Sequence, residues 1–166
     1  MTTVEEAPDR LLAAARPLVV RYCRARLGAG PEADDVAQDV CVAVFKALTT
    51  RPPDRPFPNF VCGIARHKVA AARKAAARQW DEPVAELPDE VDASLDPVHH
   101  ALRRELGERM AKLLQVLPEK QREIVVLRVA VGLSAEETAE VVGSTPGAVR
   151  VAQHRALSQL RKVVGG

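Results

Sequence analysis

Residues that favour helix ends occur at short, regular spacing near the C-terminus of the sequence. Ser134 and Glu137 form the S-x-x-E pattern of a capping box, in which each side chain satisfies a free backbone donor of the other residue. We therefore expect a helix over about 135–142. Gly143 follows it and can take the left-handed conformation that ends a helix.

The next segment predicts a second helix, which could bind DNA. Thr145 suits the N-cap and Pro146 the first helical position, so the helix covers about 146–163. Two helices joined by such a short turn are typical of a DNA-binding helix-turn-helix, whose second helix enters the major groove. From Val141 to the C-terminus there are four Lys or Arg residues and no Asp or Glu, which suits a phosphate-lined groove.

Helical spacing separates a buried face of this second helix from a face that can read bases. The expected buried positions are Val149, Ala156, Leu160 and Val163. The expected contacts to duplex DNA are Thr145, Gly147, Ala148, Arg150, Val151, His154 and Arg155. Arg150 is the best single candidate, because an arginine that binds guanine bidentately discriminates it by about 1–3 kcal/mol. The alternative is an αα-hairpin of a helical bundle with a solvated basic face.

A second candidate site lies on a helix predicted over about 59–80. This segment holds five Lys or Arg residues and no acid, and aromatic residues stand at its start. Bases stack on aromatic rings while cations hold the backbone, so the pattern suits single-stranded nucleic acid. The candidate contacts are Phe57, Asn59, Phe60, Arg66, His67, Lys68, Arg73 and Lys74. The alternative is that both phenylalanines fill the core and that some cations form a solvated surface.

Acidic residues gather on the helix predicted over about 32–48. Asp34, Asp35 and Asp39 could suggest a magnesium-dependent nuclease, because paired carboxylates hold catalytic metal ions. They could also be acids placed in the first turn for the helix dipole. We favour a protein-docking surface, because the face also carries Gln38 and Val42.

Histidines and cysteines have no spacing that predicts a metal site or a catalytic centre. The histidines are His67, His99, His100 and His154, and the cysteines, which we expect to be buried free thiols, are Cys23, Cys41 and Cys62. No phosphate-cradling glycine loop or nucleophile elbow is visible. We therefore expect a protein that is not an enzyme and needs no cofactor.

Composition and charge predict how the chain is organised. The 47% hydrophobic content with only 3% aromatic residues favours slim, closely packed helices and an all-α fold. Residues 81–98 carry seven acids, three prolines and no Lys or Arg, whereas the segments before and after them have net charges of +5 and +4. We expect two small helical domains, 1–80 and 99–166, joined by an extended acidic linker over 81–98.

Periodicity predicts the remaining helices over about 9–27, 99–116 and 118–131, and a proline-rich, non-helical segment over 49–58. The predicted core stripes are Val36, Val40, Val44 and Leu48 on one helix, and Val61, Ala65, Val69, Ala72 and Ala76 on the next. No apolar run approaches the roughly 20 residues of a membrane span, and the N-terminus lacks a secretory pattern. We expect a cytoplasmic protein without membrane insertion.

Three segments together resemble the extracytoplasmic-function (ECF) group of bacterial sigma factors, of the sigma-70 family. Residues 34–40, Asp-Asp-Val-Ala-Gln-Asp-Val, look like sigma region 2.2. Residues 117–124 and 132–150 look like regions 4.1 and 4.2. Residues 16–26 and 147–157 are most similar to the actinobacterial sigma D subgroup.

The resemblance implies a factor that binds core RNA polymerase and directs promoter-specific transcription initiation. It implies that Asp34, Asp35, Gln38, Asp39 and Val42 bind the β′ clamp helices, that 59–78 recognises and melts the −10 element, and that 145–155 reads the −35 element. The β flap is a further expected contact, and the family commonly has an anti-sigma partner. The family usually has tryptophan and leucine where this chain has Phe60 and Val61, and asparagine where it has His67, so the flipped −10 base is not carried over.

Two other classes of protein compete with this interpretation. A stand-alone helix-turn-helix regulator would bind promoter DNA without polymerase, but it has no need for the acidic face beside a basic helix. A polymerase-binding decoy would have no need for the cationic face of 146–163.

Overall fold

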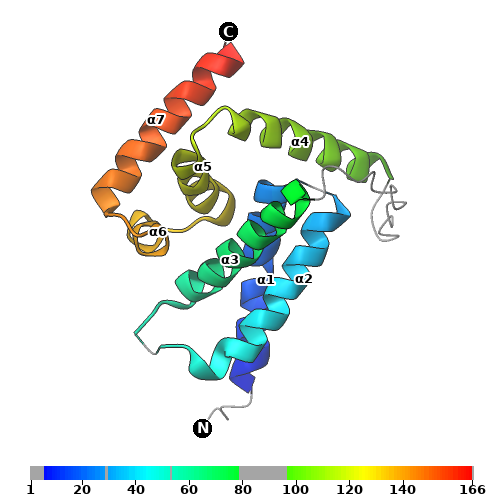
Figure 1. Ribbon diagram of the computed structural model, residues 1–166, viewed down its shortest axis with the longest axis vertical. Coiled ribbons are helices and arrows are strands. Elements are labelled where there is room, and N and C mark those ends of the chain that lie inside the picture. Colours follow the sequence, from blue (N-terminus) through cyan, green and yellow to red (C-terminus); the bar gives the residue numbers. More distant parts are fainter. Residues whose placement is uncertain (1–5, 29, 53, 79–96, 166) are drawn as a thin grey trace.

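The computed structural model describes residues 6–28, 30–52, 54–78 and 97–165, and the regular elements in these ranges are all helices (Figure 1). In chain order they are α1 (Glu6–Leu27), α2 (Pro31–Ala47), the 3₁₀-helix η1 (Leu48–Thr50), α3 (Phe57–Arg78), α4 (Pro97–Gln115), α5 (Glu119–Val125), the π-helix η2 (Val126–Val131), α6 (Ala135–Val142) and α7 (Pro146–Gly165). The prediction of an all-α fold is confirmed.

The expected acidic linker falls almost wholly outside the described residues, as do the side chains of His99 and His100. Pro97 and Val98, which we assigned to the linker, form the first turn of α4 instead. Proline is tolerated there because the first backbone N–H groups of a helix have no partner within it.

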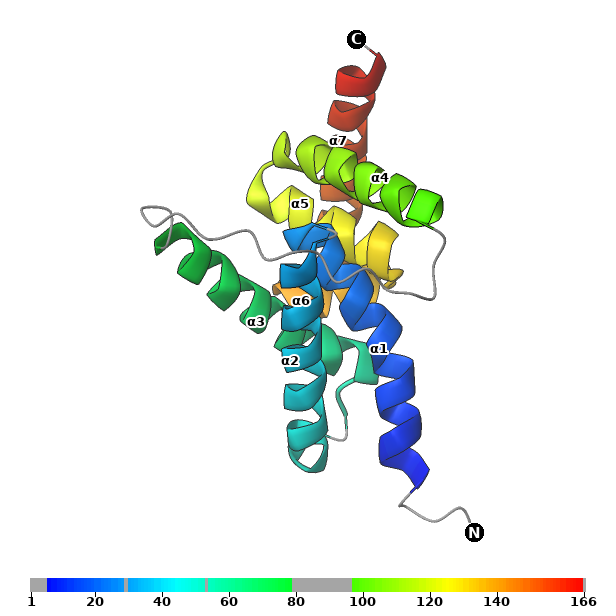
Figure 2. The ribbon, with the colours of Figure 1, turned by 90° about the vertical axis from the view of Figure 1, so that its right-hand side faces the viewer.

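Helices α1, α2 and α3 form the N-terminal lobe, whose core is built from small and branched side chains. Val19, Val40, Val44 and Val61 are fully buried, so the helices approach one another closely. In the stripe predicted on α2, Val40 and Val44 are buried, whereas Val36 is half-buried. The fourth predicted residue, Leu48, is half-buried and belongs to η1. The opposite face of α2 is exposed. On α3, however, Ala76 is exposed, because the C-terminal end of this helix projects beyond α2 (Figure 2).

Helices α4 to α7 form the C-terminal lobe, which is centred on α5 and η2. Leu117, Ile124, Leu127, Val149 and Ala156 are buried, so α7 packs on α5 through two of its predicted core positions. The prediction for Val163 is wrong, since this side chain is 45% exposed. Helix α7 extends beyond the lobe at its C-terminal end (Figure 1).

The helix-turn-helix has the local geometry that the sequence predicts. Glu137 N–H donates to Ser134 Oγ at 3.0 Å, and Ser134 N–H donates to Glu137 Oε1 at 2.9 Å, which completes the capping box. Gly143 takes the left-handed conformation with φ of 70°, and Ala148 N–H donates to Thr145 Oγ1 at 3.2 Å. Both predicted helix boundaries at this turn are confirmed.

Three local predictions need correction. The segment 49–58 was expected to be non-helical, but Phe57 and Pro58 form the first turn of α3, where proline is tolerated. Pro118 is the N-cap of α5 and not its first helical residue. The helix predicted to end at about 131 changes to π geometry over 126–131 before Gly132 ends it with φ of 91°.

The two lobes pack directly on each other (Figure 2). Helix α1 contacts α4 and η2, and α3 contacts α6. One hydrophobic cluster runs through both lobes and includes Val19 and Tyr22 from one side and Leu117 and Leu127 from the other. The basic helix α3 therefore lies against the lobe that carries the helix-turn-helix.

Replacing Ser134 with alanine should lower the free energy of unfolding by about 1 kcal/mol, because the capping box loses its hydroxyl acceptor. Urea unfolding followed by circular dichroism measures this change. Ser158→Ala on α7 is the control and should change stability by less than about 0.5 kcal/mol. Equal stability of the two variants would contradict a stabilising cap.

Candidate nucleic-acid interface

The residues expected to read duplex DNA lie together on the outer face of α7. Val149 and Ala156 anchor this helix on the lobe, which directs the other side outward. The expected contacts, Thr145, Gly147, Ala148, Arg150, Val151, His154 and Arg155, are all exposed. The face is therefore open to a groove of duplex DNA.

Arg150 has an ion-pair partner on the preceding helix. Its Nη2 donates to Glu136 Oε1 at 2.8 Å, and the two side chains are 59% and 64% exposed. Hydrogen bonding by its own backbone N–H and then by Arg150 holds the pKa of the Glu136 carboxyl below its usual range. Because exposed ion pairs contribute little free energy, Arg150 can leave this partner for a base or a phosphate.

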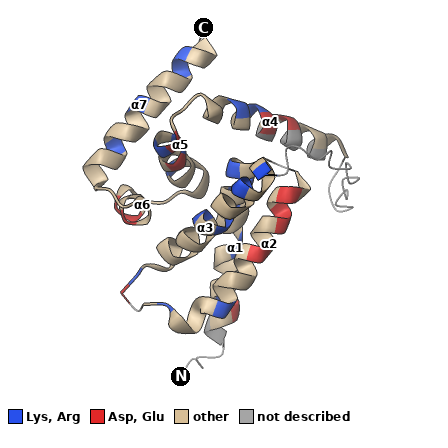
Figure 3. Cartoon of the chain, in the orientation of Figure 1, with Lys and Arg blue, Asp and Glu red and all other residues tan. Residues whose placement is uncertain are grey.

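The acidic surface on α2 is exposed along one edge of the N-terminal lobe (Figure 3). We call Asp35, Gln38, Asp39 and Val42 the docking face, since all four side chains point away from the core. The fifth predicted residue, Asp34, is also exposed but pairs with Arg24 Nη2 at 3.1 Å.

An apolar residue that was not among the predicted contacts, Phe45, lies at the end of the docking face. Phe45 is 55% exposed and lies one turn beyond Val42, which is 47% exposed. Large exposed apolar side chains beside polar residues are typical of protein–protein contacts. The sequence held one signal for the exposure of Phe45. Val40 and Val44 are four positions apart and so share one face of α2, whereas position 45 does not fit this spacing and lies on another face.

The eight residues proposed for single-stranded nucleic acid divide into two groups. The cations and the histidine, His67, Lys68, Arg73 and Lys74, are exposed, and Arg66 is half-buried. Asn59 and Phe60 are buried, with exposed fractions of 4% and 8%. The ring of half-buried Phe57 lies 6.5 Å from that of Phe60 and has the Arg51 guanidinium 5.4 Å above it.

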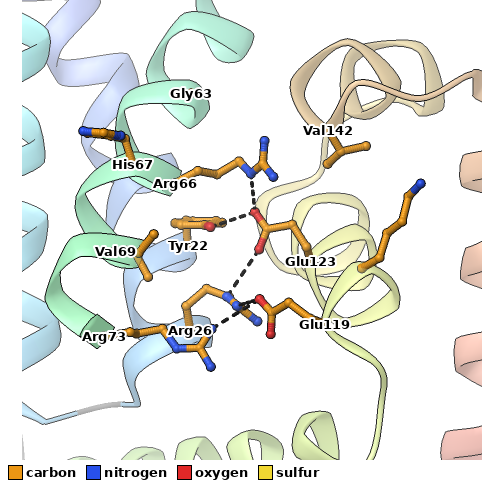
Figure 4. Close-up of a pocket in the computed structure, with 12 residues that line it drawn as sticks. Tyr22, Arg26, Gly63, Arg66, His67, Val69, Arg73, Glu119, Glu123 and Val142 are labelled. Atoms are coloured by element: carbon orange, nitrogen blue, oxygen red, sulfur yellow. Dashed lines mark hydrogen bonds and ion pairs between the residues drawn. The ribbon is translucent and has the colours of Figure 1, made fainter. Parts of the chain in front are cut away.

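A cluster of charged residues joins the two lobes beside α3. We call Tyr22, Arg26, Arg66, Arg73, Glu119 and Glu123 the interlobe cluster (Figure 4). Tyr22 donates its O–H to Glu123 Oε1 at 2.7 Å, and Arg66 Nε donates to the same oxygen at 2.8 Å. Arg26 Nε lies 3.3 Å from Glu123 Oε2, and Glu119 binds Arg26 and Arg73. The Glu123 side chain is only 7% exposed, so its negative charge must be stabilised by partners from the other lobe.

A cleft of about 760 Å³ opens beside the interlobe cluster, between α1, α3 and α5 (Figure 4). Arg26, Arg66, Arg73, His67 and Lys120 line it together with the two glutamates of the cluster. The charged part of its lining therefore holds more cations than acids, and the two glutamates of the C-terminal lobe partly neutralise it.

The interlobe cluster could not be predicted from local sequence patterns. Tyr22 and Glu123 are separated by 101 positions, and no local pattern links such distant residues. The one available signal was Glu123 itself, which stands directly before the apolar run from Ile124 to Leu127. An acid beside a core segment must find a partner if the segment is buried.

Burial, followed by the nearby Glu123 carboxylate, raises the pKa of Tyr22 far above its ordinary value of 10. Tyr22 is the only tyrosine of the chain, so tyrosinate absorbance reports on it alone. We expect its native titration midpoint to lie well above the value measured in urea. A midpoint near 10 in both states would contradict the buried hydrogen bond.

The same shift makes a contribution to stability that depends on pH. The pKa of Tyr22 is higher in the folded protein than in the unfolded chain. The resulting contribution to the free energy of unfolding is therefore complete below pH 10 and is lost as the pH rises further. Tyr22→Phe should lack this alkaline loss and should be less stable at neutral pH by about 1.5–3 kcal/mol, the typical contribution of a hydrogen bond to a charged group.

Both lobes of the chain match known protein families. The family described as "Sigma-70 region 2" matches residues 11–79, and "Sigma-70, region 4" matches residues 107–160. No described helix is long and apolar enough to cross a membrane.

Two curated relatives are similar over most of the chain. The "ECF RNA polymerase sigma factor SigD" of Mycobacterium tuberculosis is 56% identical over 151 residues, which cover 88% of this chain and 71% of the relative. The "ECF RNA polymerase sigma factor ShbA" of Streptomyces griseus is 50% identical and covers 94% of this chain and 86% of its own. The solved structure of CnrH in complex with the cytosolic domain of CnrY has a TM-score of 0.71 at 27% identity, over 97% of this chain and 89% of that one.

Proposed function

Because this chain belongs to the ECF RNA polymerase sigma factors, we propose how its surfaces divide the work of promoter recognition. The chain is a non-enzymatic initiation factor, and it directs promoter-specific transcription. Residues 1–80 bind core polymerase and open the −10 element, residues 81–98 form the linker, and residues 99–166 read the −35 element. The matches at 11–79 and 107–160 support this division.

The exposed face of α7 reads the −35 element, and this is the observation that carries the proposal. Arg150, Val151 and His154 face outward from a helix with no acid along its length. The N-terminal end of α7 carries the positive end of the helix dipole, which favours phosphate. Arg150 can bind a base edge while Arg155 binds the DNA backbone.

Helix α3 binds the −10 strand. Its exposed cations, Lys68, Arg73 and Lys74, can follow the backbone of a single strand. Phe57 is the most accessible ring of the set and can stack on a base, whereas Phe60 is available only if the N-terminal end of α3 becomes uncovered.

The docking face of α2 binds the β′ clamp helices of core polymerase. Acidic and amide side chains beside Val42 and Phe45 combine charge with apolar area, which suits a stable protein interface. A stand-alone helix-turn-helix regulator has no use for such a surface, so the sigma function accounts for more of the chain.

Helix α4 carries a second apolar surface that fits the β flap. Val98, Leu102, Leu106 and Met110 recur every four residues, and each is more than half exposed. This spacing places them in one row, which suits a partner helix. Through these surfaces the protein acts with polymerase in the cytoplasm.

An anti-sigma factor can compete for the same surfaces. The similar protein CnrH was solved in complex with the cytosolic domain of CnrY, at 27% identity to this chain. The exposed row on α4, and Val42 and Phe45 on α2, are the apolar areas that such an inhibitor would need to cover.

Run-off transcription with purified core polymerase and a genomic promoter library tests the proposed function. We expect defined transcripts that appear only when this protein is added, and core polymerase alone is the control. The sigma function fails if the protein adds no promoter-specific transcript.

Two single variants should separate DNA reading from polymerase binding. Arg150→Ala should lower promoter affinity of the holoenzyme by about 5- to 150-fold, because one bidentate arginine contributes about 1–3 kcal/mol, and should leave core binding intact. Asp39→Arg should weaken core binding, measured by native gel shift. Arg21→Ala, an exposed cation on α1, is the control for Arg150→Ala. Loss of core binding in Arg150→Ala would indicate a folding defect and contradict the assignment.

A further inference from the structure

We propose that Glu136, on the first helix of the helix-turn-helix, is a positioning residue for Arg150 and makes this arginine selective for a base over a phosphate. The inference rests on the proposed function, because it takes α7 as the −35 reader. It goes further by assigning a role in base selection to an acid of α6, a helix that contains none of the expected DNA contacts.

The ion pair between Glu136 and Arg150 links the two helices of the motif. Arg150 Nη2 donates to Glu136 Oε1 at 2.8 Å, and the two residues are separated by 14 positions. Helix α7 carries four Lys or Arg residues, and Arg150 is the one that takes part in an ion pair between described residues. The reading helix therefore has one cation that an acid holds before DNA is bound.

The carboxylate of Glu136 is itself held in place. It lies in the first turn of α6, where the capping box of Ser134 and Glu137 fixes the start of the helix. The positive end of the helix dipole stabilises a carboxylate at this position. Glu136 also accepts a hydrogen bond from its own backbone N–H. Arg150 therefore meets a negative charge that is anchored to the start of α6.

The other two acids of α6 have different partners. Glu137 belongs to the capping box, where its Oε1 accepts from the backbone N–H of Ser134 at 2.9 Å. Glu140 Oε2 accepts from Asn59 Nδ2 of α3 at 2.8 Å. Glu136 is thus the acid of this helix that pairs with the reading helix, and its contact has no part in capping α6 or in joining the lobes.

A guanidinium that is held in this way can still bind a base. Arginine has five N–H donors in one plane, and the bond to Glu136 uses one of them. Recognition of guanine needs two donors, which bind O6 and N7. Arg150 can therefore keep Glu136 as a partner while it reads a base edge. Because an arginine side chain loses rotamer freedom when it binds, holding it in advance also lowers the free-energy cost of reading the base.

The same acid disfavours capture of Arg150 by the DNA backbone. A phosphate beside the guanidinium brings a second negative charge close to the Glu136 carboxylate, whereas O6 and N7 of guanine are neutral acceptors. Phosphate contacts carry no direct sequence information. Glu136 therefore shifts Arg150 from a contact that every DNA sequence offers to a contact that depends on the base.

The test compares the wild-type protein with Glu136→Gln, each bound to core polymerase. The DNA is a promoter found by run-off transcription, with each position of its −35 element varied in turn, and affinity is measured by fluorescence anisotropy. We expect Glu136→Gln to lose about threefold or more of the base preference at one position, because residues in direct contact are energetically coupled. That position should be the one at which Arg150→Ala also loses its preference. Affinity for DNA without a promoter should not fall.

Two controls separate this role from a structural one. Glu108→Gln on α4 removes the same charge at an exposed position and should leave every base preference unchanged. In an Arg150→Ala background, Glu136→Gln should change the base preference by less than about twofold, because the side chain that it positions is gone.

Unchanged base preference in Glu136→Gln would overturn the proposal. So would an equal loss of affinity for promoter and non-promoter DNA, which indicates an acid with a purely structural role. A protein that yields no promoter-specific transcript fails as a sigma factor. The same variants are then compared on duplexes that the full chain enriches from random DNA, so the role of Glu136 is decided independently of the sigma function.

Discussion

The buried carboxylate of Glu123 is the constraint on which the arrangement of the whole molecule depends. A charge removed from water requires partners, and this one finds Tyr22, Arg26 and Arg66 on the opposite lobe. Each lobe therefore completes the polar interior of the other. Such a network adds little net stability compared with an apolar contact, but it accepts only one geometry, because any shift leaves a charge without a partner.

The predictable part of the structure is the part governed by neighbours in sequence. Ser134, Glu137, Gly143 and Thr145 act within one helical turn of the groups that they bind, so their types alone locate the helix-turn-helix. The outward face of α7 follows from the same register, because burial of Val149 and Ala156 leaves Arg150 exposed. Local hydrogen bonding and helical periodicity are sufficient for both results.

The unpredicted part depends on contacts between distant segments. Phe57 and Pro58 belong to a helix although their composition favours a loop, because proline has no cost in a first turn. The π geometry of 126–131 has no compositional signal that we used, and it follows the segment that buries Glu123. Asn59 is typical of an exposed polar residue, yet it is buried and donates a hydrogen bond to Glu140, which lies 81 positions away. Periodicity identifies a basic face but does not say what covers it.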